Sequence, residues 1–188
     1  YSRKIDALSV MQNPQDPRRW RTTTLQTVTT IEQEGESGGF SEVIIMLDQS
    51  GSTAEIFGER RVLSYIKDAA YCLIGYAKHF GLPVTVVAFH SYAYLLSAKA
   101  KNYIEHGKKV FMLRPIGNTN LLDAVNLTLR MKPEKALIAL ITDGHVNQND
   151  LMYLANQNGV NRVIAAVVDA NKEGVATVKM ISDKIQVY

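Results

Sequence analysis

The sequence contains a single cysteine, Cys72, so the chain cannot form an internal disulfide framework. A lone thiol is typical of a reducing compartment, and we therefore expect a cytoplasmic location. No apolar run approaches the roughly 20 residues that a membrane-spanning helix requires, and no signal-peptide pattern opens the chain. Because the chain begins at Tyr1 and not at methionine, we expect it to be a fragment or processed product of something longer.

The chain also lacks a strong charge of either sign. Its net charge is +3 at pH 7, and residues 1–21 account for all of it, with five Lys and Arg against two Asp. The rest of the chain balances at zero, so it has no electrostatic footprint for nucleic acid. The Gly-rich loop followed by Lys and Ser or Thr that binds nucleotide phosphates is absent as well. We therefore expect no nucleic acid partner, and any ATPase would have to be another chain.

At 188 residues the chain fits one domain of ordinary size. Residues 1–40 differ in composition from the remainder of the chain. They contain a basic stretch around Trp20, a β-branched segment at 22–31 that predicts an extended strand, and an acidic, Gly-rich stretch at 32–39 that predicts a linker. We divide the chain into an N-terminal extension and linker, residues 1–40, and a domain, residues 41–188.

Apolar segments of strand length alternate with helical patterns along residues 41–188. The predicted strands are 43–47, 84–89, 93–96, 136–142, 162–168 and 185–187; the predicted helices are 59–80, one through 122–129, one through 151–154, and 173–182. No element is predicted for the polar and basic residues 99–109. The alternation indicates parallel βαβ units, and hence an α/β fold with a doubly wound, mostly parallel central sheet and helices on both faces.

The most informative stretch is VIIMLDQSGST, residues 43–53, where a continuous apolar run ends at Asp48. The run suits a central strand that is covered on both faces. Ser50, Gly51 and Ser52 favour a turn directly after Asp48, because small hydroxyl residues and glycine bind or bend the backbone locally. In an open α/β sheet, ligands lie beyond the carboxyl ends of the strands, so one carboxylate and two or three hydroxyls are expected to converge there.

Two later segments have related features. Thr119 stands just before a predicted helix that either Thr119 or Asn120 can cap, and if Asn120 does so the hydroxyl of Thr119 is free. Asp143 and Gly144 follow the apolar strand 136–142, which places a second carboxylate at a strand end. The tight turn at His90 and Ser91 offers those two residues no acidic neighbour in sequence, so no site role is predicted for them.

Together, the Asp48-Gln49-Ser50-Gly51-Ser52 segment, Thr119 before a helix and Asp143-Gly144 after a later strand resemble the von Willebrand factor A (VWA) domain and its metal-ion-dependent adhesion site. The resemblance covers about residues 41–188 and includes the hairpin AFHSYAYLL, which is similar to the antiparallel edge of that Rossmann-like fold. It implies a metal site in which Ser50 and Ser52 contribute hydroxyl oxygens directly. Thr119, Asp48 and Asp143 would bind directly or through water. Mg²⁺ is the expected ion, with Mn²⁺ or Ca²⁺ as alternatives that accept the same oxygens.

The resemblance implies a protein-interaction module and no enzyme, in which the ion binds a Glu or Asp side chain of a partner protein. For an intracellular chain it points to VWA subunits that work with AAA+ ATPases of the MoxR or chelatase type. An extracellular adhesion domain is the alternative within this class. A Mg²⁺-dependent phosphoryl-transfer hydrolase with Asp48 as nucleophile is a second alternative, although Ser50 stands where such enzymes need a second acid.

Overall fold

The computed structural model describes residues 39–147, 149–150, 153, 162–168 and 185–187, all within one compact unit, Gly38–Tyr188. Its sheet has six strands in the order β5-β4-β1-β6-β7-β8, and every neighbouring pair is parallel except β4 and β5. The strands are β1 Glu42–Asp48, β4 Val84–Phe89, β5 Ala93–Ala100, β6 Ala136–Thr142, β7 Arg162–Val167 and β8 Ile185–Val187. The predicted fold class, a mostly parallel sheet with one antiparallel edge strand, is confirmed.

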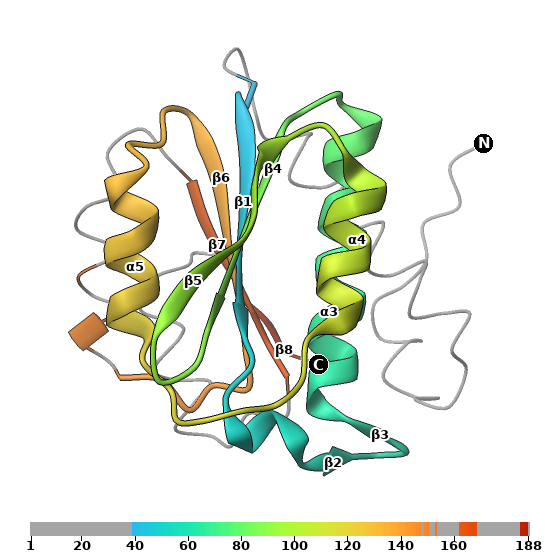
Figure 1. Cartoon of the computed structure of the whole chain (residues 1–188), viewed down its shortest axis with the longest axis vertical. Helices are drawn as coiled ribbons and strands as arrows, with labels where there is room; N and C mark the ends of the chain where they lie inside the picture. Colours follow the sequence, from blue (N-terminus) through green and yellow to red (C-terminus); the bar gives the residue numbers. More distant parts are fainter. Residues whose placement is uncertain (1–38, 148, 151–152, 154–161, 169–184, 188) are drawn as a thin grey trace. The chain divides into compact units, whose positions relative to one another are not determined.

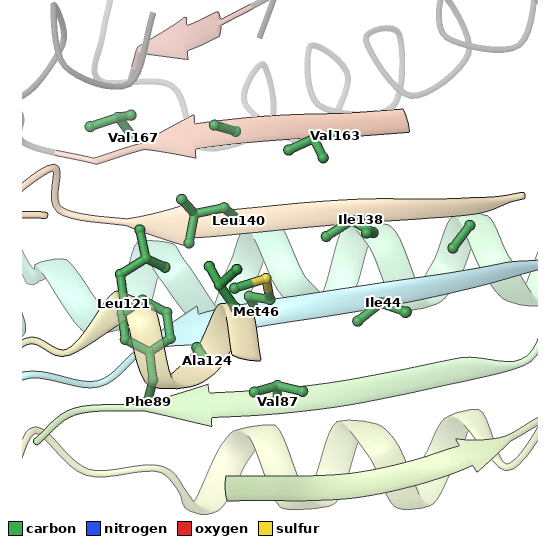
Figure 2. Close-up of a cluster of buried hydrophobic side chains, with 13 residues drawn as sticks. Ile44, Met46, Val87, Phe89, Leu121, Ala124, Ile138, Leu140, Val163 and Val167 are labelled. Atoms are coloured by element: carbon green, nitrogen blue, oxygen red, sulfur yellow. The ribbon is translucent and has the colours of Figure 1, made fainter. Parts of the chain in front are cut away.

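The central strands β1, β4 and β6 are buried along their whole length. Their continuous apolar sequences are explained by helices on both faces, because a strand covered on two sides has no solvent-facing positions. On one face, Ile44 and Met46 of β1 pack with Phe89 of β4, Leu140 of β6 and Leu121 of the following helix (Figure 2). This cluster fixes β1 between β4 and β6, which places the ends of three strands side by side.

Three helices of the described ranges cover the sheet: α3 Val62–His79, α4 Tyr103–Met112 and α5 Leu121–Arg130. In Figure 1, α3 and α4 lie on one side of the sheet and α5 on the other, as in a doubly wound fold. Helix α3 follows the predicted stripe, with Val62, Ile66 and Ala77 almost fully buried. Helix α5 is capped by Asn120, whose side-chain oxygen accepts a hydrogen bond from Asp123 N at 3.2 Å.

Two local predictions are wrong. The helix predicted from residue 59 begins only at Val62, because the segment before it forms a short hairpin of β2 Ile56–Phe57 and β3 Arg60–Arg61. Residues 99–109, for which no element was predicted, contribute the end of β5 and most of α4. Helix α4 buries only His106 and Val110, and because one of these is a polar histidine, its buried positions do not form an apolar stripe.

Several predicted elements lie outside the described residues. These are the extended strand at 22–31, most of the helix through 151–154, and the helix at 173–182. The proposed boundary between residues 40 and 41 likewise stays a prediction. Among the residues that the structure does describe, no helix is long and apolar enough to cross a membrane.

Candidate metal centre

The loop after β1 folds around its own polar side chains. Asp48, at the carboxyl end of β1, is fully buried, and its Oδ1 accepts a hydrogen bond from Ser50 N at 2.9 Å. The hydroxyl oxygens of Ser50 and Ser52 are 3.0 Å apart, and Thr53 Oγ1 donates to Ser50 O at 2.7 Å. The chain then enters the 3-10 helix η1, Gly51–Ala54. Asp48 therefore holds the turn that brings both serine hydroxyls together.

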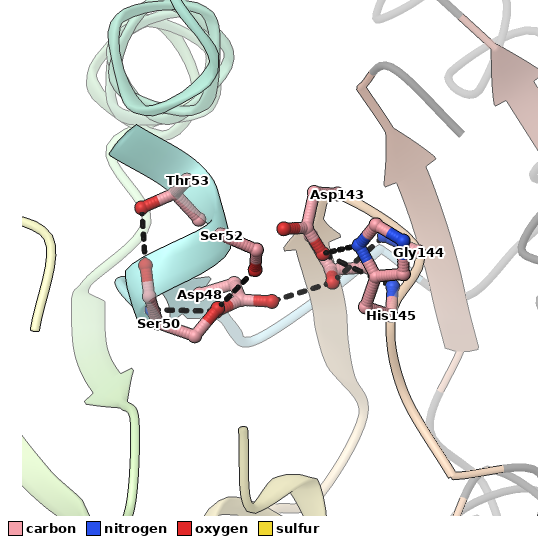
Figure 3. A network of polar contacts seen from close by, with 8 residues as sticks. Asp48, Ser50, Ser52, Thr53, Asp143, Gly144 and His145 are labelled. Carbon is pink, nitrogen blue, oxygen red and sulfur yellow. Dashed lines mark hydrogen bonds and ion pairs between the residues drawn. The ribbon is translucent and has the colours of Figure 1, made fainter. Parts of the chain in front are cut away.

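The neighbouring strand β6 contributes the second carboxylate. Leu47 pairs with Ile141 in the parallel register, so Asp48 lies level with Thr142. Thr142 Oγ1 donates to Asp48 Oδ2 at 2.7 Å and accepts from Gly144 N at 3.1 Å. Figure 3 shows Asp143, the next residue, facing the group formed by Asp48, Ser50 and Ser52. Strand pairing thus brings together four of the five residues that the sequence singled out.

Asp143 has one satisfied and one unsatisfied carboxylate oxygen. Its Oδ1 accepts from His145 N at 3.0 Å and lies 3.4 Å from His145 Nδ1. Its Oδ2 is buried and has no hydrogen-bond partner. A buried acceptor without a partner loses the free energy of its hydration, so a cation or a water molecule bound at this oxygen would stabilise the folded protein.

The two carboxylates also oppose each other electrostatically. Burial, together with the charge of Asp143, raises the pKa of Asp48 from 3.8 to about 6, against the hydrogen bonds from Ser50 and Thr142. Within the described part of the chain, no Lys or Arg forms an ion pair with either carboxylate. The site therefore carries buried negative charge that no described Lys or Arg side chain compensates.

Thr119, the fifth predicted ligand, comes from a loop that is held against the first one. Gly51 N donates to Gly117 O at 2.8 Å, and Ile116 N donates to Gln49 O at 2.8 Å. Thr119 is half-buried, and its side chain makes no hydrogen bond to another described residue. Of the two residues that the sequence allowed as the cap of α5, Asn120 is the one that caps it. The hydroxyl of Thr119 is therefore not used for capping.

Several residues that support the site were not predicted. Gln49, only 5% exposed, accepts from Tyr94 Oη, and its Nε2 donates to Arg114 O at 3.2 Å, which ties the first loop to the segment before Thr119. Ser91 Oγ accepts from Asn118 N at 2.9 Å, and His90 O accepts from Asn120 N at 2.8 Å. The tight turn between β4 and β5 therefore supports the Thr119 loop. The only sequence signal for Gln49 was its place inside the Asp48–Ser52 segment.

The donor set fits a hard divalent cation. It consists of two buried carboxylates, two adjacent serine hydroxyls and a free threonine hydroxyl, and oxygen ligands of this kind suit Mg²⁺, Mn²⁺ or Ca²⁺. A cation bound here would give Asp143 Oδ2 a partner and would offset the charge of the two buried carboxylates. No group of three or more His, Cys, Asp or Glu side chains with metal-site geometry occurs in the described ranges, so the donor set depends on hydroxyls.

Comparisons by sequence gave no match, either to known protein families or to curated proteins. Solved structures do match. The conserved hypothetical protein BatB from Bacteroides thetaiotaomicron aligns with 80% of this chain and 89% of its own, at a TM-score of 0.64 and 18% identity. The von Willebrand factor type A protein from Catenulispora acidiphila aligns with 81% of this chain and 39% of its own, at a TM-score of 0.59 and 17% identity.

A third match is the VWA domain of SpRpn10, which aligns with 79% of this chain and 86% of its own, at a TM-score of 0.59 and 12% identity. Identities this low establish the fold and leave the function open. The strand order, the antiparallel edge and these alignments agree, and this chain has the fold of the von Willebrand factor A domains.

Proposed function

We propose that the domain is a protein-interaction module in which Asp48, Ser50, Ser52, Thr119 and Asp143 hold a Mg²⁺ ion that binds an acidic side chain of a partner. The observation that carries this proposal is the buried, unpartnered Oδ2 of Asp143 beside the buried carboxylate of Asp48. Without a bound cation, two buried carboxylates this close together would destabilise the folded protein.

The residues divide the work by their contacts. Both oxygens of Asp48 already accept hydrogen bonds, from Ser50 N and Thr142 Oγ1, so its main role is to orient the loop and supply charge. Ser50 and Ser52 supply neutral hydroxyl oxygens, and Asp143 supplies its unpartnered carboxylate oxygen, Oδ2. With so few direct charges, a bound cation would stay electron-poor and attract a further carboxylate.

The partner is proposed to present a Glu or Asp, and an AAA+ ATPase of the MoxR or chelatase type is our first candidate, in the cytoplasm. The low cysteine content supports that compartment. A gene for an AAA+ ATPase next to this one would support the assignment. A signal peptide in the full-length gene would instead favour the extracellular adhesion alternative.

A phosphoryl-transfer hydrolase is the weaker alternative. An Asp48 nucleophile would need an accessible oxygen, whereas its side chain is fully buried and both oxygens are engaged. Hydrolysis of a simple phosphate ester by the pure protein with Mg²⁺, abolished in Asp48→Asn, would favour this alternative over the interaction module.

The test is the free energy of unfolding measured in chelator and in Mg²⁺. At about 100 times the dissociation constant, Mg²⁺ should stabilise the wild-type protein by about 2.7 kcal/mol, because only the folded state binds it. Asp143→Ala and Ser52→Ala should remove most of this gain while the circular dichroism spectrum stays unchanged.

Ser64→Ala is the matched control, because Ser64 is also a half-buried serine but lies on α3. It should keep the full gain. Equal stability of the wild-type protein in chelator and in saturating Mg²⁺, Mn²⁺ and Ca²⁺ would refute the metal site.

A further inference from the structure

The hairpin β2–β3 lies at the metal end of the sheet. It follows η1, which contains Ser52, and Figure 1 shows β2 and β3 at the same end as the carboxyl end of β1. Ile56 is four residues after Ser52, and four residues span at most about 14 Å. A peptide bound at the metal site could therefore reach the hairpin within a few of its own residues.

The pairing of the hairpin sorts its side chains onto two faces. Phe57 is opposite Arg60, and Ile56 is opposite Arg61, and side chains that lie opposite each other share a face. The first pair packs on α3: the rings of Phe57 and Tyr65 are 5.9 Å apart, and the Arg60 guanidinium lies 5.1 Å from the centre of the Tyr65 ring. The second pair therefore faces away from the helix.

The hairpin is held in place by several contacts. Arg60 Nη1 is 2.7 Å from Asp68 Oδ2, Tyr65 Oη donates to Phe57 O at 3.2 Å, and Val62 N donates to Glu55 O at 2.9 Å. Gly58, with a φ of +62°, supplies the left-handed residue that the turn requires. The 74% exposure of Ile56 is thus imposed by an anchored backbone.

Unpaired cations lie at the same end. Arg61 shares the outer face with Ile56, and Arg114, whose carbonyl oxygen accepts from Gln49 Nε2, is exposed beside the first loop. Neither forms an ion pair with a described carboxylate. Glu55 and Glu59 are also exposed in this segment, so the positive charge is a property of the outer face and not of the whole hairpin.

We propose that the outer face of the β2–β3 hairpin, formed by Ile56 and Arg61, is a second contact for the partner segment that docks at the metal site. The segment it fits is extended and acidic, with an aliphatic residue within about four positions of the docking acid. Ile56 buries that aliphatic side chain, and Arg61 attracts a further carboxylate. This inference rests on the proposed function, because the metal site sets the position of the docking acid.

Fluorescein-labelled nine-residue peptides test the proposal by fluorescence anisotropy in Mg²⁺. Each is built on Gly and Ser with Glu at the centre, and Leu, followed by Asp, is stepped through the other positions. At least one Leu position should bind about ten times more tightly than the same peptide with Ser in place of Leu. Ile56→Ser should abolish that advantage, and Arg61→Ser should weaken binding about threefold in a salt-dependent manner.

Ile104→Ser and Arg130→Ser are the matched controls and should bind like wild type. Ile104 is 73% exposed on α4, and Arg130 is exposed in the last turn of α5, so neither lies at the metal end. Glu-dependent binding in Mg²⁺ with no advantage for Leu at any position would overturn the hairpin inference and leave the proposed function intact. A Leu advantage that persists in chelator would overturn the metal-dependent docking and show that the hairpin binds the peptide independently of the metal site. No binding by any peptide would overturn both.

Discussion

Asp48 and Asp143 lie on neighbouring strands and differ in what their oxygens contact. Asp48 has a hydrogen bond to each oxygen, from Ser50 N and Thr142 Oγ1, whereas Asp143 Oδ2 has none. Burial raises the pKa of Asp48 to about 6 in spite of these hydrogen bonds, and the charge of Asp143 adds to the effect. The metal-free domain therefore contains an acid that binds a proton more readily when folded than when unfolded.

This shift predicts that the metal-free protein loses stability as the pH rises from about 4 to about 6. In that window the folded state retains a proton on Asp48 that the unfolded chain, with a pKa near 3.8, has released. The full shift corresponds to about 3 kcal/mol of stability, which is fully present below the window and lost above it. Urea unfolding in chelator between pH 4 and 7 measures it.

Asp48→Asn should remove this decrease, because the amide does not titrate and has nearly the same shape. Asp68→Asn is the control, since that side chain is about half exposed in an ion pair with Arg60, and it should retain the decrease. An Asp48→Asn variant with the same pH dependence as the wild type would show that another group is responsible.

The loop before α5 is positioned by the turn between β4 and β5. Gly117 has a φ of +68°, and a Cβ there would lie 2.5 Å from Ser91 Oγ and 3.0 Å from His90 Nδ1. The same turn also accepts the backbone N–H groups of Asn118 and Asn120. Close approach of the two loops thus requires glycine at position 117, for its conformation and for its lack of a side chain.

Gly117→Ala should therefore destabilise the protein by about 1–2 kcal/mol through the left-handed backbone, and by a further 1–3 kcal/mol, roughly, through overlap with Ser91. It should also weaken Mg²⁺ binding, because Thr119 lies on the displaced loop. Denaturant unfolding and isothermal titration calorimetry measure the two effects.

Gly81→Ala provides the comparison. Gly81 has a similar φ of +64°, but a Cβ there would have no atom within 4 Å. It should cost only the backbone term and leave metal binding unchanged. If the two variants were equally stable and bound Mg²⁺ equally well, contact between the loops would have no role in the site.

The elements that could be predicted are those whose burial is uniform or periodic. Strands β1 and β6 are buried at every position, and α3 has a regular apolar stripe. Helix α4 was not predicted because one of its buried residues is a histidine. The ring of His106 forms hydrogen bonds with Ser97 Oγ at 2.7 Å and Ala100 O at 3.0 Å. The β2–β3 hairpin was not predicted because each of its strands has only two residues and its isoleucine, Ile56, is exposed.

The sequence predicted which residues gather at the candidate site, but it did not predict the residues that support them. Asp48, Ser50, Ser52 and Asp143 stand at strand ends, where local sequence marks them. The supporting residues form hydrogen bonds with residues distant in sequence: Thr142 with Asp48, and Gln49 with Arg114. No pattern within a short window of sequence encodes contacts of that range, so only the folded arrangement identifies them.

At the scale of the whole molecule, residues Gly38–Tyr188 form a unit of their own, and every site residue belongs to it. A chain cut to residues 39–188 should therefore fold and keep the Mg²⁺-dependent gain of about 2.7 kcal/mol. Thermal unfolding of the cut and full-length chains, each in chelator and in Mg²⁺, makes the comparison. Loss of the gain in a folded, cut chain would assign residues 1–38 a role in the site and contradict the predicted extension.

The hydrogen bond between Thr142 and Asp48 joins residues 94 positions apart, across the pairing of β1 with β6. A cation held by oxygens from both loops would span that same seam. Separating the two strands would then require the ion to leave first, so occupancy would slow amide hydrogen exchange in the middle of the sheet more than at its edges. A partner that binds through the ion would therefore bind only the domain in which β1 and β6 are paired.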